Sequence, residues 1–284
     1  MSPRVALLTP DESGAYGGSR WPDVAARLAA PLQNVGLTVE TRSWMTGDDL
    51  AGYDLVLPLL AWGYHTDGDW SGRLDAWRSA SVPLRNPAHV LSWNADKAYL
   101  GRLADHGAPI VPTLFVDRVD EAAMAEAAER FGTDRLIAKP RVSAGAYRTI
   151  RWSPGTPLDD APDRAAMIQP YLPDIEAGGE VSLLYFGGAF SHAIRKRPQP
   201  GDFRVQPEYD GILTPQAPDA DEFAAAAAVL ASVEEPLLYA RIDLVRDEEG
   251  KPLLMEAELV EPDLYLQYDD AAPARFADAV RAAI

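Results

Sequence analysis

The alternation of apolar and polar positions predicts a chain that mixes strands and helices. Short apolar runs rich in Leu, Ile and Val are typical of strands, and apolar residues spaced three or four apart are typical of helices. In the first part of the chain the two patterns alternate, which predicts a parallel sheet with covering helices. The expected strands lie at residues 5–9, 37–44, 54–60 and 82–86, and the expected helices at 21–33 and 74–79, with Ser19 as a candidate N-cap.

Strands predominate in the rest of the chain. The expected strands lie at residues 114–116, 135–139, 167–171, 181–186 and 189–196, with one more in 141–149, and the expected helices at 96–106, 120–131, 222–232 and 274–283. Gly187 and Gly188 suit the turn of a β-hairpin, and Asp120 is a candidate N-cap. The pattern indicates the α/β fold class with α+β elements, and 284 residues suffice for about two domains.

Composition excludes several kinds of chemistry. The chain has no cysteine, which excludes disulfides, thiolate metal ligands and a cysteine nucleophile. Its net charge of −17 argues against sequence-independent binding of nucleic acid. It has no apolar run long enough to span a bilayer and no basic-then-apolar signal at its start. We therefore expect a cytoplasmic protein without a nucleic-acid or membrane partner.

Three acidic residues near the end of the chain stand in apolar surroundings. Asp243 lies in one strand-like run, and Glu256 and Glu258 lie in the next, after the turn at residues 247–250. Glu256 and Glu258 share one face of their strand, and pairing of the two strands can bring Asp243 opposite them. Buried carboxylates require neutralisation, and ligation by oxygen alone suits Mg²⁺ or Mn²⁺. The alternative is a solvated strand face that carries acids by chance.

Two segments earlier in the chain suggest contacts with a nucleotide. Lys139 ends an apolar strand and is followed by small residues at 142–146, which would let backbone N–H groups approach a phosphate. The spacing of a P-loop is absent, and an ordinary surface turn is the alternative. The strand at 167–171 is interrupted by Pro170, which would leave backbone groups for an adenine edge, and Glu180 is placed to accept from ribose hydroxyls. A crossover between domains with an exposed acid is the alternative there.

The order of these segments resembles the ATP-grasp superfamily, over residues 93–268 with a matching N-terminal α/β domain. The likeness is to the glutathione-synthetase and ribosomal-protein-S6-modifying ligases, and to the small ligases that close the cycloserine ring. It implies an N-terminal domain at 1–92, a central ATP-grasp subdomain at 93–168 and a C-terminal one at 169–284. The two subdomains would clasp ATP between them.

The resemblance also implies roles for individual residues. The ATP contacts would be Lys97, Lys139, Ser143, Ala144, Gly145, Gln169, Tyr171, Leu172, Glu180 and Met255. Asp243, Glu256 and Glu258 would hold Mg²⁺ (or Mn²⁺), as two ions that bridge phosphate oxygens. Arg195 and Arg241 would stabilise the transferring phosphoryl group or the tetrahedral intermediate. Two positions depart from the superfamily pattern: Glu258 stands where Asn is frequent, and Ser182 where related ligases often carry a substrate-binding Arg.

The implied reaction is an ATP- and Mg-dependent carbon–nitrogen ligation, which forms ADP and phosphate through an acylphosphate. The substrates would be a small, amino-acid-like carboxylate and an amine. Candidate substrate contacts are Asp11, Tyr64, His65, Arg204 and Gln206, and candidate lids are residues 143–146 and 198–206. His65 is equally well explained as a packed residue. A homodimer is expected by analogy alone.

Two other functions remain open at this point. One is an ATP-binding sensor or partner module without ligase activity, which the unusual Ser182 suggests. The other is a ligase that modifies peptides, although the chain offers no evident extra peptide-binding domain.

Overall fold

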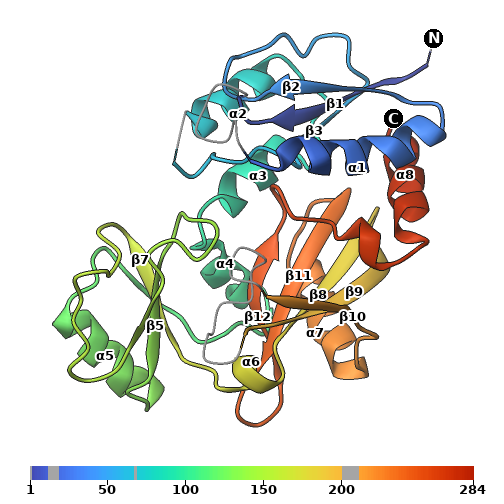
Figure 1. Cartoon of the computed structure of the whole chain (residues 1–284). Helices are drawn as coiled ribbons and strands as arrows, with labels where there is room; N and C mark the ends of the chain where they lie inside the picture. Colours follow the sequence, from blue (N-terminus) through green and yellow to red (C-terminus); the bar gives the residue numbers. More distant parts are fainter. Residues whose placement is uncertain (1, 12–18, 67–68, 200–210) are drawn as a thin grey trace.

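A computed structural model describes residues 2–11, 19–66, 69–199 and 211–284. Within these residues the strands form three sheets, and the chain passes from the first through the second to the third (Figure 1). Arg204 and Gln206, with most of the candidate lid at 198–206, lie outside the described residues. No described helix is long and apolar enough to cross a membrane.

The first sheet is parallel, with strand order β2-β1-β3. Its elements are β1 (Arg4–Thr9), α1 (Trp21–Asn34), β2 (Thr38–Ser43), β3 (Leu55–Leu57) and α2 (Trp70–Ser79). This confirms the expected parallel sheet, although β3 is shorter and α2 longer than their apolar patterns predict. The prediction of Ser19 as N-cap of α1 is wrong, because the capping position is Arg20, which makes no capping hydrogen bond through its side chain.

The strand predicted at 82–86 is also wrong. Only an isolated bridge between Val56 and Leu84 forms there, because the chain then turns away toward the third sheet. The buried Asn86 fixes this departure: its Nδ2 donates to Tyr239 O (3.0 Å) and Leu259 O (2.9 Å), and its Oδ1 accepts from Leu238 N (2.8 Å). Helices α3 (Ala88–Asn94) and α4 (Tyr99–Asp105) follow, and the pattern at 96–106 predicts only the second.

The second sheet is antiparallel, with strand order β4-β7-β5-β6. Its strands are β4 (Leu114–Val116), β5 (Leu136–Pro140), β6 (Ile150–Trp152) and β7 (Ala166–Pro170), and α5 (Glu121–Phe131) covers it. As expected, Asp120 caps α5, accepting a hydrogen bond from Ala123 N (2.9 Å). The helix ends at Gly132, whose φ of 67° favours glycine.

The third sheet has five antiparallel strands in the order β10-β9-β8-β11-β12. Its elements are α6 (Asp174–Ala177), β8 (Glu180–Phe186), β9 (Ala189–Arg197), β10 (Ile212–Pro215), α7 (Ala220–Ala231), β11 (Tyr239–Arg246), β12 (Pro252–Glu258), the 3-10 helix η2 (Leu266–Tyr268) and α8 (Ala272–Ala282). Every residue of β8 is buried, because β8 is a central strand packed on both faces.

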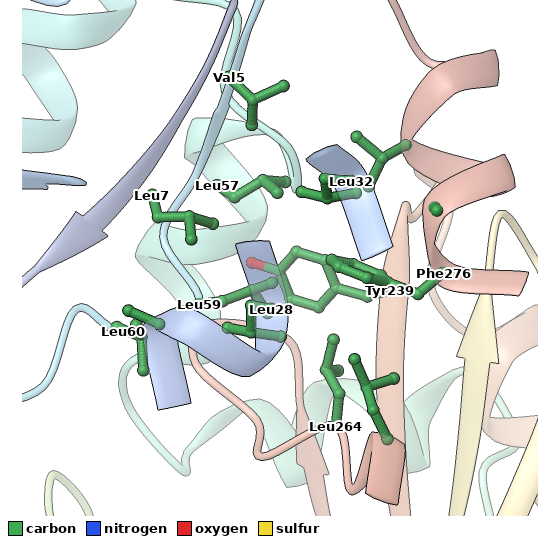
Figure 2. Packing of buried hydrophobic residues seen from close by; sticks show 14 of the residues in the cluster. Val5, Leu7, Leu28, Leu32, Leu57, Leu59, Leu60, Tyr239, Leu264 and Phe276 are labelled. Atoms are coloured by element: carbon green, nitrogen blue, oxygen red, sulfur yellow. The ribbon is translucent and has the colours of Figure 1, made fainter. Parts of the chain in front are cut away.

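One hydrophobic core joins the first and third sheets. Val5 and Leu7 of β1 and Leu28 of α1 pack in the same cluster as Tyr239 of β11 and Phe276 of α8 (Figure 2). Helix α8 lies against α1 and also contacts β8 and β9, so it connects the N-terminal part to the third sheet (Figure 1). The two parts are thereby held in a fixed arrangement, which positions loops from the first sheet over the third. The domain boundaries at 92 and 168 remain a prediction.

Candidate active site

A cavity of about 860 Å³ lies where the three parts of the chain meet, within the range typical of sites for cofactors and substrates. Most of the residues singled out in the sequence line it: Tyr64, His65, Lys97, Lys139, Ser143, Ala144, Gly145, Gln169, Tyr171, Leu172, Glu180, Arg241, Asp243, Met255, Glu256 and Glu258. They come from segments up to about 190 positions apart, so the fold, and not local sequence, assembles the site. Arg195 and Asp11 are not among the lining residues.

Arg195 therefore requires a correction. Its guanidinium donates to Gly178 O (2.6 Å) and lies 3.7 Å from a carboxylate oxygen of Glu222. The next residue, Lys196, lines the cavity instead, because successive side chains of a strand point to opposite faces. The sequence places the basic residues 195–197 on a strand, but it does not indicate that the face of Lys196 is the one that meets the cavity.

Two lysines, Lys97 and Lys139, line the cavity. Lys97 is buried, and its Nζ donates to Ser143 O (2.7 Å) and lies 3.0 Å from Glu256 Oε1. It thus ties the small-residue loop to the acidic strand. Lys139 Nζ lies 3.5 Å from Met255 Sδ, and burial lowers the pKa of Lys139 to about 8. A group that is poorly solvated and mostly cationic near neutral pH is suited to bind phosphate.

The end of β7, the strand beside β5, also borders the cavity. Gln169 is buried, and its Nε2 donates to Thr113 Oγ1 (2.9 Å). Its side chain is therefore held in place by the segment that directly precedes β4. Tyr171 donates its hydroxyl to Glu176, and the guanidinium of Arg151 lies 4.0 Å from its ring centroid. Burial raises the pKa of Tyr171 to about 12. This segment and Met255 offer an apolar surface with backbone groups nearby.

The acidic residues are arranged as their spacing suggested. In the register of β11 and β12, Asp243 faces Glu256 and Arg241 faces Glu258. Asp243 accepts hydrogen bonds from Ser182 Oγ (2.5 Å), Lys196 Nζ (3.1 Å) and Arg241 Nη2 (3.0 Å). Burial opposes ionisation of Asp243, but Arg241 and Lys196 outweigh it, so its pKa lies well below the usual range.

Ser182 acquires a structural explanation from this network. It is fully buried on β8, directly opposite Asp243 in the register of β8 and β11. A serine fits this place because its short hydroxyl reaches the carboxylate without adding charge. On the other side of the same network, Lys196 Nζ lies 2.5 Å from Glu180 Oε1. Buried ion pairs of this kind are stable only when complete.

The chemistry of the acidic donors fits a hard divalent cation. Glu256 and Glu258 both line the cavity and present only oxygen atoms. Burial raises the pKa of Glu258 to about 8, and its ion pair with Arg241 offsets only part of this because Glu256 and Asp243 repel its charge. Among the described residues no three His, Cys, Asp or Glu are grouped to hold one ion. An entering cation would therefore compete with Lys97 and Arg241 for these carboxylates.

Glu261 is a second residue that sequence reasoning missed. It follows β12 by three positions and lines the same cavity as Glu258. The signal in the sequence that marks this position is a Glu-Pro pair, Glu261 and Pro262, shortly after an acidic strand. Trp62, Tyr64 and His65, from the loop after β3, border this part of the cavity.

Solved structures share this fold. The crystal structure of D-cycloserine synthetase DcsG superimposes with a TM-score of 0.80 at 27% identity, covering 98% of both chains. D-alanine–D-alanine ligase from Bacillus anthracis gives a TM-score of 0.70 at 16% identity, over 99% of this chain and 97% of that one. The second likeness concerns the fold alone. The fold is that of an ATP-grasp ligase, which confirms the class expected from the order of motifs.

Relatives in sequence identify the family within this fold. The cycloserine biosynthesis protein DcsG of Streptomyces lavendulae is 31% identical over 283 residues, which span 89% of this chain and 91% of that protein. Residues 5–86 match the model of the D-cycloserine synthetase DcsG N-terminal domain. The chain belongs to the DcsG family of the ATP-grasp superfamily, whose members use ATP and divalent metal ions. It is a ligase of the ADP-forming type.

Proposed function

We propose that this ligase joins a small, amino-acid-like carboxylate to an amine by way of an acylphosphate, with Mg²⁺ as its metal. The observation that carries the proposal is the meeting of Lys97, Lys139 and the acidic pair Glu256 and Glu258 in one cavity. Cations and carboxylates side by side suit a polyphosphate that arrives with its metal. The names of the similar proteins, a D-cycloserine synthetase and a D-alanine–D-alanine ligase, agree with substrates of this class.

In this proposal the lysines bind the phosphates of ATP. Lys97 and Lys139 stand beside the small-residue loop, whose backbone would cover the phosphates, while Lys196 and Arg241 approach from the third sheet. The segment from Gln169 to Leu172 and the side chain of Met255 would hold the adenine. Glu180 would accept hydrogen bonds from the ribose hydroxyls and would lose part of its ion pair with Lys196.

Glu256 and Glu258 would hold the metal, with Asp243 as a third ligand, and two ions are expected. When bound, magnesium supplies positive charge that offsets the phosphate oxygens. The cationic partners of these carboxylates, Lys97 and Arg241, would then be released toward the phosphates. Side chains that neutralise the acids in this structure are thus the same ones that bind the nucleotide in the proposal.

The chemistry then needs positioning more than a reactive side chain. A carboxylate oxygen of the substrate attacks the γ-phosphorus, and the bond to the β-phosphate oxygen breaks to give ADP. The amine nitrogen next attacks the acyl carbon, phosphate leaves, and the nitrogen loses a proton. Arg241 and Lys196 are placed to neutralise the charge that develops. Enclosure within the cavity would protect the acylphosphate from water.

The test is release of ADP across a panel of amino acids and simple carboxylates, with and without Mg²⁺. We expect at least one amino acid to stimulate release, and Glu256→Gln to lower the rate by about 100-fold or more. Glu248→Gln is the matched control, because Glu248 is exposed at the far end of the same hairpin. Equal rates in wild type and Glu256→Gln would contradict the proposal. Nucleotide binding without stimulated release would instead indicate an ATP-binding sensor.

A further inference from the structure

Glu261 lines the cavity but is not among the residues assigned to the nucleotide or to the metal. It lies beyond the acidic end of β12, near the loop that carries Tyr64. Glu261 and Tyr64 line the same cavity, and burial, followed by the charge of Glu261, raises the pKa of the Tyr64 hydroxyl well above its usual range. Glu261 is therefore a carboxylate at the border between the first and third sheets.

This carboxylate differs from Glu256 and Glu258 in having no direct ion pair among the described residues, since Arg241 and Lys97 act on its charge only from beyond ion-pair distance. Glu256 pairs with Lys97, and Glu258 pairs with Arg241. Glu261 makes no hydrogen bond or ion pair with any residue in the described part of the chain. An unpaired, poorly solvated carboxylate beside other acids destabilises the fold. It is retained where a ligand supplies the missing cation.

The backbone around Glu261 is held in place on both sides. Tyr239 Oη donates to Val260 O (2.8 Å), and Leu259 N donates to Asn94 Oδ1 (2.9 Å). On the other side Pro262 restricts the chain, and Arg241 Nη1 donates to Asp263 O (3.4 Å). The carboxylate is therefore presented from a rigid segment, which is the arrangement expected of a preorganised binding group.

We propose that Glu261 binds the ammonium group of the substrate and so restricts the enzyme to carboxylates that carry a free amino group. This rests on the proposed function insofar as the same substrate carries the carboxylate to be activated. An ammonium matches the site because it offers both positive charge and N–H donors to a carboxylate that lacks both. The carboxylate of the same bound substrate would then extend toward the cationic side chains that are proposed to bind the phosphates.

Direct binding tests this inference without requiring turnover. Calorimetry on the ADP-bound protein would compare alanine with propanoate and serine with 3-hydroxypropanoate, using both enantiomers of each amino acid. At least one amino acid should bind about 10-fold or more tightly than its counterpart without the amino group. Glu261→Gln should abolish this preference, and Glu248→Gln should retain it. Equal binding of the paired ligands by the wild type, or a full preference in Glu261→Gln, would overturn the inference.

Stability gives a second readout that separates a binding role from a structural one. Glu261 is half-buried, and burial followed by the charge of Glu258 raises its pKa to about 8, so removing this carboxyl should leave the melting temperature of Glu261→Gln unchanged or higher. A lower melting temperature, with ligand preference intact, would mean that the carboxylate supports the fold and would overturn the inference. The wild-type comparison of paired ligands remains decisive even if the variant folds poorly.

The failure of this inference is distinguishable from failure of the proposed function. ADP release driven equally well by carboxylates without an amino group would overturn the role of Glu261 and leave the ligase reaction standing. Selective binding of amino acids without any release of ADP would overturn the ligase reaction and leave the role of Glu261 standing. Displacement of the bound amino acid by Mg²⁺ alone would show that Glu261 is a metal ligand and would also overturn the inference.

Discussion

Asp243 lies directly opposite Glu256 across the β11–β12 pair, yet the two carboxylates are neutralised by different lysines. Lys196 reaches Asp243 from β9, at 3.1 Å, and Lys97 reaches Glu256 from the start of α4, at 3.0 Å. The acidic hairpin is thus held by cations from two separate parts of the chain. Binding of ATP with a metal would redistribute these pairs, which links the assembly of the site to its occupation.

The buried position of Lys196 predicts a large effect on stability. Lys196→Met would leave the carboxylates of Glu180 and Asp243 without their shared partner, and should lower the free energy of unfolding by about 3–5 kcal/mol. Denaturant unfolding measures this loss. Adding Glu180→Gln to the same variant should recover part of the lost free energy of unfolding, since one of the two unpaired carboxylates is removed. A loss below about 1 kcal/mol in the single variant would contradict a buried network.

Lys139 predicts how ATP binding depends on pH. Its pKa of about 8 means that it is cationic below this pH and neutral above it. Because phosphate favours the cationic form, ATP affinity should fall as pH rises through about 8, and binding above this pH should take up a proton. Calorimetry in buffers of different ionisation enthalpy measures both effects. Lys139→Arg, whose guanidinium stays charged, should bind ATP without this dependence, and an unchanged dependence would refute the assignment.

Asn86 predicts that the first and third sheets are coupled through one side chain. Asn86→Ala would remove the partners of Leu238 N, Tyr239 O and Leu259 O, and should cost about 2–4 kcal/mol of unfolding free energy. Gln33→Ala, at an exposed position of α1, is the control and should change stability by less than about 0.5 kcal/mol. Thermal and denaturant unfolding of both variants compare them directly. Similar losses in the two would mean that Asn86 does not join the sheets.

The sequence predicts those parts of the site that depend on local periodicity. The two-residue spacing of Glu256 and Glu258 and the turn between β11 and β12 suffice to place Asp243 opposite the acidic pair. The order of lysine, small-residue loop and acidic strands likewise suffices for the superfamily. These features are determined by neighbours along one strand or one hairpin.

Other parts of the site depend on contacts between distant segments, which periodicity does not encode. The strand predicted at 82–86 fails because Asn86 finds its partners on β11 and after β12. The resemblance implies Arg195, whereas the structure brings Lys196 to the cavity, because the basic residues 195–197 do not reveal which face of β9 meets it. Glu261 emerges only when the loop bearing Tyr64 and the end of β12 are seen to border one cavity.

In the proposed reaction, the substrate carboxylate is activated by transfer of the γ-phosphoryl group of ATP. The most direct test is turnover of an amino-acid substrate whose carboxylate is labelled with ¹⁸O, followed by mass analysis of the released phosphate. Attack by the carboxylate and later displacement by the amine should leave one ¹⁸O atom in each phosphate. Phosphate released without the label, in step with product formation, would contradict the account.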